Sequence, residues 1–218
     1  MSVLQNPIVG RMKQKIGGVV MTTWKGINVM KGKPLTVANP KTDPQLMRRS
    51  ALTQIVAIAR IIVAAIGFGF KEQAVRKSAF NAFTGYNLRN AFNYAAPPAA
   101  TLVPADVLVS QGTIAPTPID SLSASAAARE IVMNYFNLAT LPGQSISDLA
   151  YAVIYNATQD KWGVADTAGA DRNGGTAVGT MPTGFFAIGD NLRVYLFFYN
   201  PTQRKSSDSI TGTVVAGA

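Results

Sequence analysis

The stretch NLRVYLFFYN, residues 191–200, decides the fold class of the C-terminal half. Aliphatic and aromatic residues run through it without Gly or Pro, which predicts a β-strand. DLAYAVIYNA (148–157) has the same character, and both runs end in Tyr-Asn, where Asn can adopt a left-handed conformation and close a turn. With SITGTVVAG (209–217) as the last strand, we expect six or seven short strands in a small immunoglobulin-like β-sandwich.

The segments between these strands give weaker signals. REIVMNYFNL (129–138) fits a helix or a strand, and the pattern leaves both open. TLVPADVLVSQGTIA (101–115) predicts one short strand before Gly112, and GADRNGG (169–175) predicts a flexible turn.

The apolar run IVAIARIIVAAIGFGF (55–70) raises the question of a membrane span. It is shorter than the roughly 20 residues that a bilayer requires, and Arg60 lies near its middle. We therefore expect a buried or interfacial helix and no transmembrane segment. Thr42-Asp43-Pro44-Gln45 fits a helix start with a capping box, and the helix should run to about Ile66 and end at Gly67 and Gly69.

The remaining N-terminal sequence predicts a second helix and an extended arm. Apolar spacing favours a helix from Lys71 to about Asn93, paired antiparallel with the first. The β-rich runs 17–24 and 27–33 flank Lys25-Gly26 and predict a hairpin. The expected fold class is α+β: an extended β-hairpin arm and a helical hairpin over residues 1–98, then an immunoglobulin-like β-sandwich over residues 99–218.

Charge is distributed unevenly along the 218 residues. The chain has 20 Lys and Arg, 11 Asp and Glu and a net charge of +9; residues 1–95 carry +12 (14 − 2) and residues 96–218 carry −3 (6 − 9). A basic half can meet nucleic acid, dock on the acidic half of a neighbouring copy, or be a solvated face.

Groups that carry out chemistry are scarce. The chain has no Cys and no His, so thiol nucleophiles, disulfides and imidazole–metal sites are excluded. The acids are mostly single and lie near predicted loops, and the spacing of Asp166, Asp171 and Asn173 is not that of an EF-hand. No nucleophile elbow or phosphate-binding loop is present. We predict no enzyme activity, no catalytic residue, no cofactor and no metal.

The candidate contact residues are the basic and aromatic side chains of the arm and the first helix turn. They could neutralise phosphates or contact an acidic neighbour, with one tryptophan as a stacking platform. The set is Arg11, Lys13, Lys15, Trp24, Lys25, Lys31, Lys33, Lys41, Arg48 and Arg49.

Several motifs together resemble an uncharacterised family from Bacteroidota and their phages. They are GRMKQKIG (10–17), TTWKGINV (22–29), KPL (33–35), NPKTDPQ (39–45), AFNAFTGYNLRNAF (79–92), DVLVSQGTIA (106–115) and YLFFYNP (195–201). The resemblance covers most of the chain. It implies an N-terminal clip, a helical pair and an immunoglobulin-like C-terminal part, and it implies no activity.

These observations lead to one expected function and two alternatives. We expect a non-enzymatic structural subunit of a phage or phage-like particle, in its head, connector or tail, located in the virion after assembly in the host cytoplasm. Its partners would be copies of itself, other virion proteins and, through the basic arm, packaged DNA. The alternatives are a nucleic-acid-binding accessory protein using basic residues 11–49, and a glycan-binding surface or adhesion module using Trp162.

Overall fold

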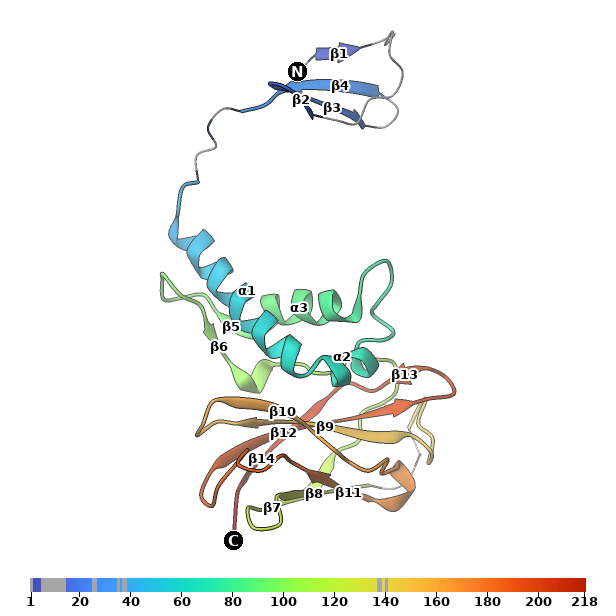
Figure 1. The fold of residues 1–218 in the computed structure, drawn as a ribbon. Helices are drawn as coiled ribbons and strands as arrows, with labels where there is room; N and C mark the ends of the chain where they lie inside the picture. The colour runs from blue at the N-terminus through green and yellow to red at the C-terminus, as the bar shows by residue number, and fades with distance from the viewer. Residues whose placement is uncertain are drawn as a thin grey trace. The chain divides into compact units, whose positions relative to one another are not determined.

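The computed structural model describes residues 2–4, 15–24, 27–34, 36, 39–136, 139 and 141–218. The chain forms two compact units, Met1–Lys41 and Thr42–Ala218 (Figure 1). The expected boundary at residues 98/99 falls inside the second unit.

The first unit is built on a four-stranded antiparallel sheet. Its strand order is β1 (Ser2–Leu4), β4 (Ile27–Gly32), β3 (Val19–Trp24) and β2 (Lys15–Ile16). The predicted hairpin is confirmed, because Trp24 pairs with Ile27 in the register of β3 and β4. The Lys25-Gly26 turn itself lies outside the described residues.

The predicted long helix breaks into α1 (Asp43–Ile61) and α2 (Val63–Gly69), whose axes are bent by 90°. Ile62, at the break, is fully buried, and the bend turns Ile66 and Phe70 into the core. Gly67 and Gly69, expected to end the helix, both lie within α2. Gly69 is required there by close packing, because a Cβ at this position would lie 2.8 Å from the backbone oxygen of Val109.

Two expectations about helix ends were wrong. Thr42 is at the N-cap of α1, but its side chain makes no capping hydrogen bond. The next helix, α3, spans only Ala79–Asn90, because residues 71–78 form turns and the Ser78 hydroxyl accepts a hydrogen bond from the Asn81 N–H at 3.1 Å. A serine cap therefore sets the start of α3, eight residues after the apolar pattern would place it.

Strands dominate the rest of the second unit, which establishes an α+β fold. One antiparallel sheet has the order β10 (Lys161–Ala165), β9 (Leu149–Asn156), β12 (Asn191–Asn200) and β13 (Lys205–Ser206), with β14 (Ile210–Val215) also paired to β12. A second sheet has the order β11 (Thr176–Thr180), β8 (Glu130–Tyr135) and β7 (Ile119–Ser125). Short pieces complete it: β5 (Phe92–Asn93), β6 (Thr101–Leu102), η1 (Pro104–Asp106) and η2 (Arg172–Gly174).

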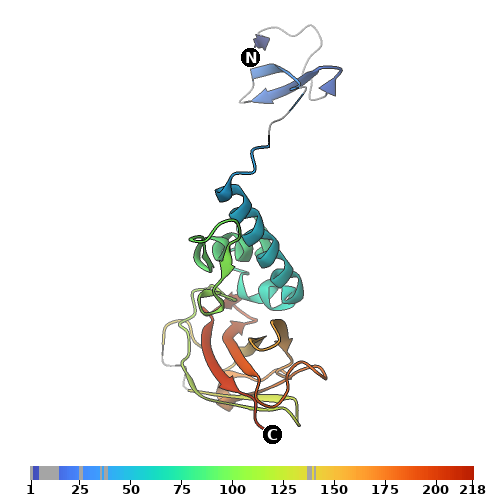
Figure 2. The same cartoon turned by 90° about the vertical axis from the view of Figure 1, so that its left-hand side faces the viewer.

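Strand β12 lies at the centre of the second unit and is buried on both faces. Tyr195 and Phe197 pack into a core shared with the three helices. Val194 and Leu196 pack into a second core shared with β8. The unit therefore has three layers, namely helices, the larger sheet and the smaller sheet (Figure 1, Figure 2). The ambiguous segment 129–138 is the strand β8, because its alternate residues enter this second core.

Residues 169–175, expected to be a flexible turn, instead hold a buried arginine. Arg172 has no exposed surface; it forms an ion pair with Asp148 at 3.3 Å and lies over the ring of Phe198, 4.1 Å from its centroid. Its Nε donates to the Ser145 carbonyl at 3.2 Å, and Asn200 donates to the other Asp148 oxygen at 2.8 Å. Burial lowers the pKa of Arg172, and the charge of Asp148 offsets part of that effect.

We expect Asp148→Asn to destabilise the protein by about 3–5 kcal/mol, because it leaves the Arg172 guanidinium buried without a countercharge. Urea unfolding followed by circular dichroism measures the change. Asp166→Asn is the matched control at an exposed carboxylate and should stay within about 0.5 kcal/mol of the parent. Equal urea midpoints for the two variants would show that the Asp148–Arg172 ion pair does not contribute this much to the free energy of unfolding.

Candidate functional site

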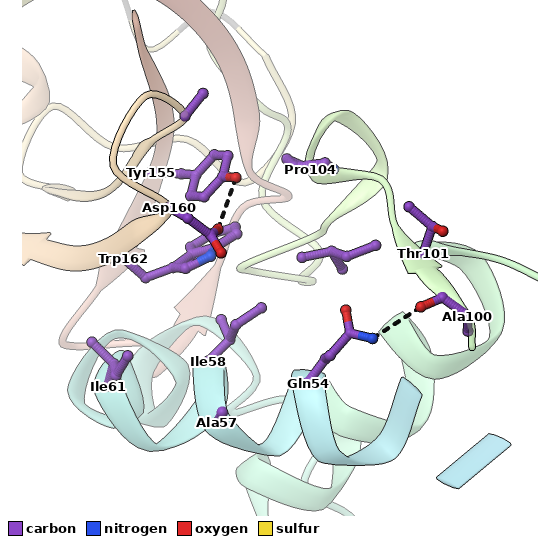
Figure 3. Close-up of a pocket in the computed structure, with 12 residues that line it drawn as sticks. Gln54, Ala57, Ile58, Ile61, Ala100, Thr101, Pro104, Tyr155, Asp160 and Trp162 are labelled. Atoms are coloured by element: carbon purple, nitrogen blue, oxygen red, sulfur yellow. Dashed lines mark hydrogen bonds between the residues drawn. The ribbon is translucent and has the colours of Figure 1, made fainter. Parts of the chain in front are cut away.

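A pocket of about 650 Å³ lies between α1 and the turn that joins β9 to β10 (Figure 3). Helix α1 and the segment 100–104 form one side, and the β9–β10 turn forms the other. The residues that define its chemistry are Gln54, Ile58, Ile61, Tyr155, Asp160 and Trp162.

Stacked aromatic rings form the sheet side of the pocket. Trp162 stands directly opposite Tyr155 in the register of β9 and β10, and their ring centroids are 4.7 Å apart. Trp162 also stacks on Tyr195 of β12 at 5.4 Å, and the Tyr195 hydroxyl donates to the Pro104 carbonyl at 2.6 Å. Trp162 is 7% exposed, so the ring proposed as a glycan platform is largely closed within this stack.

The turn that carries Asp160 repeats at the end of β12. The side-chain oxygen of Asn156 accepts hydrogen bonds from the N–H groups of Thr158 and Gln159, and that of Asn200 accepts one from Gln203. The asparagines themselves do not adopt the left-handed conformation, contrary to the sequence expectation. The left-handed residues are the fourth after each asparagine, Asp160 (φ 51°) and Arg204 (φ 55°).

Asp160 presents a carboxylate at the edge of the pocket. It accepts a hydrogen bond from the Tyr155 hydroxyl at 3.0 Å, and within the described part of the chain it has no ion-pair partner. Burial and this hydrogen bond raise the pKa of Tyr155, so the phenol stays protonated at neutral pH. Lys161 is adjacent in sequence, but its ammonium donates to the Gln159 side chain at 2.8 Å.

The helix side of the pocket combines one amide with apolar walls. Gln54 donates its amide N–H groups to the Ala100 carbonyl at 2.9 Å and to the Ser50 hydroxyl at 3.1 Å. This fixes the side chain so that its oxygen turns toward the cavity (Figure 3). Ile58 is buried beneath, whereas Ile61 at the edge is 55% exposed.

Other large apolar side chains of the helices are also exposed. Leu52 is 45% exposed, Val63 53% and Phe68 37%; Phe68 stacks on Tyr151 with ring centroids 4.9 Å apart. At 100° per residue, Leu52 and Ile61 lie on opposite sides of α1, so they do not form a single stripe. Ile61 lies on the pocket side of the helix.

The structure places the predicted contact residues in different parts of the molecule. Arg11, Lys13 and Lys25 lie outside the described residues. Lys15 and Trp24 are described only as members of β2 and β3.

The other members of the set have described positions. Lys31, Lys33 and Lys41 are exposed in the first unit. Arg48 and Arg49 are exposed on α1 in the second unit, where the Arg48 guanidinium lies 4.6 Å from the centroid of the Tyr94 ring.

The structure bears on two features considered in the sequence, a metal site and a membrane-spanning helix. Within the described ranges, no group of three or more Asp and Glu side chains is placed to hold a metal ion. No single helix described is long and apolar enough to cross a bilayer, and α1 and α2 meet that criterion only as a pair bent by 90°.

The pocket was not predicted from the sequence. Its walls come from residues 54–61, 100–104 and 155–162, and nothing in the pattern of one segment points to the other two. The one available signal was the repeated Tyr-Asn-x-Thr-Gln of 155–159 and 199–203, which marks two similar turns but not their surroundings.

Comparison with known proteins places the chain in a family. The model of the Family of unknown function (DUF6266) matches residues 10–211, and the chain belongs to this family. No curated protein and no solved structure matches it.

We expect stability to fall as pH rises above about 10. Burial raises the pKa values of Tyr195 and Tyr155, and that of Tyr135 to about 12, whereas tyrosines of the unfolded chain ionise near pH 10. The native state therefore binds more protons in this range, and its stability is lost as pH approaches the raised values.

Tyr195→Phe tests this alkaline effect. It should cost about 1 kcal/mol at pH 8, through the lost hydrogen bond to Pro104, yet make the decline above pH 10 shallower. Urea midpoints between pH 8 and 11 measure both effects. Parallel curves for variant and parent would show that Tyr195 does not contribute to the decline.

Proposed function

We propose that this chain is a non-enzymatic structural subunit of a phage or phage-like particle, in its head, connector or tail. It assembles as a homo-oligomer through its basic N-terminal arm, residues 1–41, and its helices. The observation that carries the proposal is the exposure of large apolar side chains on α1 and α2, with Ile61 at 55% and Val63 at 53%.

These exposed side chains favour an assembly over an isolated chain. Full burial of a fully exposed Val or Ile side chain is worth about 1.5–3 kcal/mol, and Ile61 and Val63, which are about half exposed, would each gain roughly half of that. Only 14% of the residues are charged, so little of the surface is available to keep an isolated subunit strongly hydrated. An oligomer that covers Ile61 and Val63 gains this burial.

The arm supports assembly by a second route. Residues 1–41 contain basic residues and no Asp or Glu, and Lys31, Lys33 and Lys41 are exposed. The sequence from 96 onward carries −3, so the arm of one copy can contact the acidic half of another. The motif resemblance to a family from Bacteroidota and their phages favours the virion, assembled in the host cytoplasm, with other virion proteins and packaged DNA as further partners.

We propose an immunoglobulin-like sandwich for the strand-rich part. Its support is the strand order: β7–β8–β11 in one sheet and β10–β9–β12–β14 in the other. Seven strands divided in this way, with two consecutive strands in each sheet and a late central strand, are typical of such sandwiches. These domains serve widely as rigid structural modules, which agrees with a subunit role but does not by itself indicate one.

Nucleic-acid binding by residues 11–49 is the second candidate. The observation in its favour is that Lys31, Lys33 and Lys41 are exposed and lie in a segment without acidic residues. Phosphate contacts of this kind give sequence-independent binding that weakens with salt.

We expect the purified chain to form a defined oligomer, and Ile61→Glu/Val63→Glu to shift it to monomer, because a carboxylate cannot be buried cheaply in an apolar contact. Light scattering after size exclusion, with negative-stain imaging, measures the state. Val75→Glu, at a 72% exposed site in the turn before α3, is the control and should leave the oligomer intact. A parent protein that is monomeric at tens of micromolar contradicts the proposal.

For the second candidate, we expect the triple variant Lys31→Gln/Lys33→Gln/Lys41→Gln to lose most duplex DNA binding and to lower the salt slope by up to about three. Fluorescence anisotropy from 50 to 200 mM salt measures both. Arg76→Gln/Lys77→Gln, which removes exposed charges of the second unit, is the control. If the DNA affinity does not change with salt, or is the same in the triple variant as in the parent, the arm is not the DNA-binding site.

A further inference from the structure

We propose that the pocket between α1 and the β9–β10 turn binds a lysine side chain from the N-terminal arm of a second copy of this chain. The inference rests on the proposed function, because it names the two surfaces through which neighbouring subunits meet. Three features carry it: the polar atoms of the pocket, its apolar and aromatic walls, and the charge of the arm.

Asp160 and Gln54 each present a hydrogen-bond acceptor to the pocket. The Tyr155 hydroxyl donates to Oδ1 of Asp160, and no donor to Oδ2 is found among the described residues. The amide nitrogen of Gln54 is fully engaged, so the group it offers to the cavity is its carbonyl oxygen (Figure 3). A ligand rich in donors and positively charged satisfies these atoms, whereas an anion would be repelled by Asp160.

The walls suit the two halves of a lysine side chain. Ile58 and Ile61 offer apolar surface to its methylene groups, which commonly lie along such surfaces while the ammonium stays near polar groups. Tyr155 supplies an aromatic ring beside the carboxylate, with one face stacked on Trp162, and a ring of this kind attracts cations.

The arm is the segment of the chain that provides such side chains. Residues 1–41 contain seven Lys and Arg and no Asp or Glu. Lys33 and Lys41 are exposed, and the residues described between them (34, 36, 39 and 40) belong to no helix or strand. Lys161, the nearest lysine to Asp160 in sequence, is already held by Gln159.

A neighbouring subunit accounts for the pocket edge as well as for the pocket itself. Ile61 at the pocket edge is 55% exposed, and Thr101 and Leu102 also line the pocket. One lysine side chain is too small to cover these edge residues as well as fill the pocket. A neighbouring subunit that contributes its arm would cover them with its own surface.

Cross-linking of mixed, full-length chains tests the proposal. Unlabelled and ¹⁵N-labelled protein are co-refolded in equal amounts and treated with a zero-length carbodiimide, which joins a carboxylate to a lysine in direct contact. We expect cross-linked peptides between Asp160 and a lysine of residues 1–41, with about half of them joining a labelled to an unlabelled chain.

Two variants sharpen the result. Asp160→Asn should abolish this cross-link; asparagine tolerates the left-handed backbone at position 160 and still accepts the Tyr155 hydrogen bond, so the fold is kept. Asp166→Asn, at another exposed carboxylate of the same sheet region, should leave the cross-link at its parental yield.

The possible failures are distinguishable by measuring the oligomeric state of the same sample. An oligomer without an Asp160–arm cross-link overturns the pocket assignment and leaves the structural-subunit proposal standing. Cross-links that never mix the two labels overturn the second copy as the source. A monomer without cross-links overturns both proposals, and a cross-link from Asp160 to a lysine outside residues 1–41 overturns the arm as the occupant.

Discussion

The structure depends on one constraint: strand β12 is apolar on both faces and must be covered on both. Its residues alternate between two cores, one shared with the helices and one shared with the smaller sheet. A strand of this composition is not stable at the edge of a sheet or with one face in water. The helical layer is therefore part of the same unit as the sheets, and α1 and α2 are bent so that Ile62, Ile66 and Phe70 reach Phe197 and its neighbours.

Covering β12 also shapes the surface. The helices use their inner residues for the core, and Ile61 and Val63, on either side of the bend, stay about half exposed. The same packing brings α1 beside the β9–β10 turn and creates the pocket lined by Gln54 and Asp160. The surfaces proposed for assembly are thus consequences of how the core is closed, and they come from segments about a hundred residues apart in sequence.

Much of the architecture could be predicted from the sequence. The strand at 191–200 is confirmed over the full predicted range, and 148–157 is confirmed as β9 within one residue at each end. Local pattern suffices there because burial on both faces requires a continuous apolar run.

The pattern failed where tertiary contacts override it. The break at Ile62 follows from packing against a sheet that comes later in the chain, and the helical period is the same on both sides of the break. Residues 169–175 have the composition of a loose turn. Only the structure shows that Arg172, within this segment, forms a buried ion pair with Asp148. The pocket could not be predicted for the same reason, since its three walls meet only in the folded chain.

The buried pair of Asp148 and Arg172 has a consequence for how this family can diverge. Neither charge can be lost alone without leaving the other in a site that is closed to solvent. Both residues can be kept, or both exchanged for neutral side chains of similar volume, whereas the loss of either charge alone destabilises the fold. We therefore expect positions 148 and 172, which lie on either side of the β9–β10 hairpin, to change together within the family.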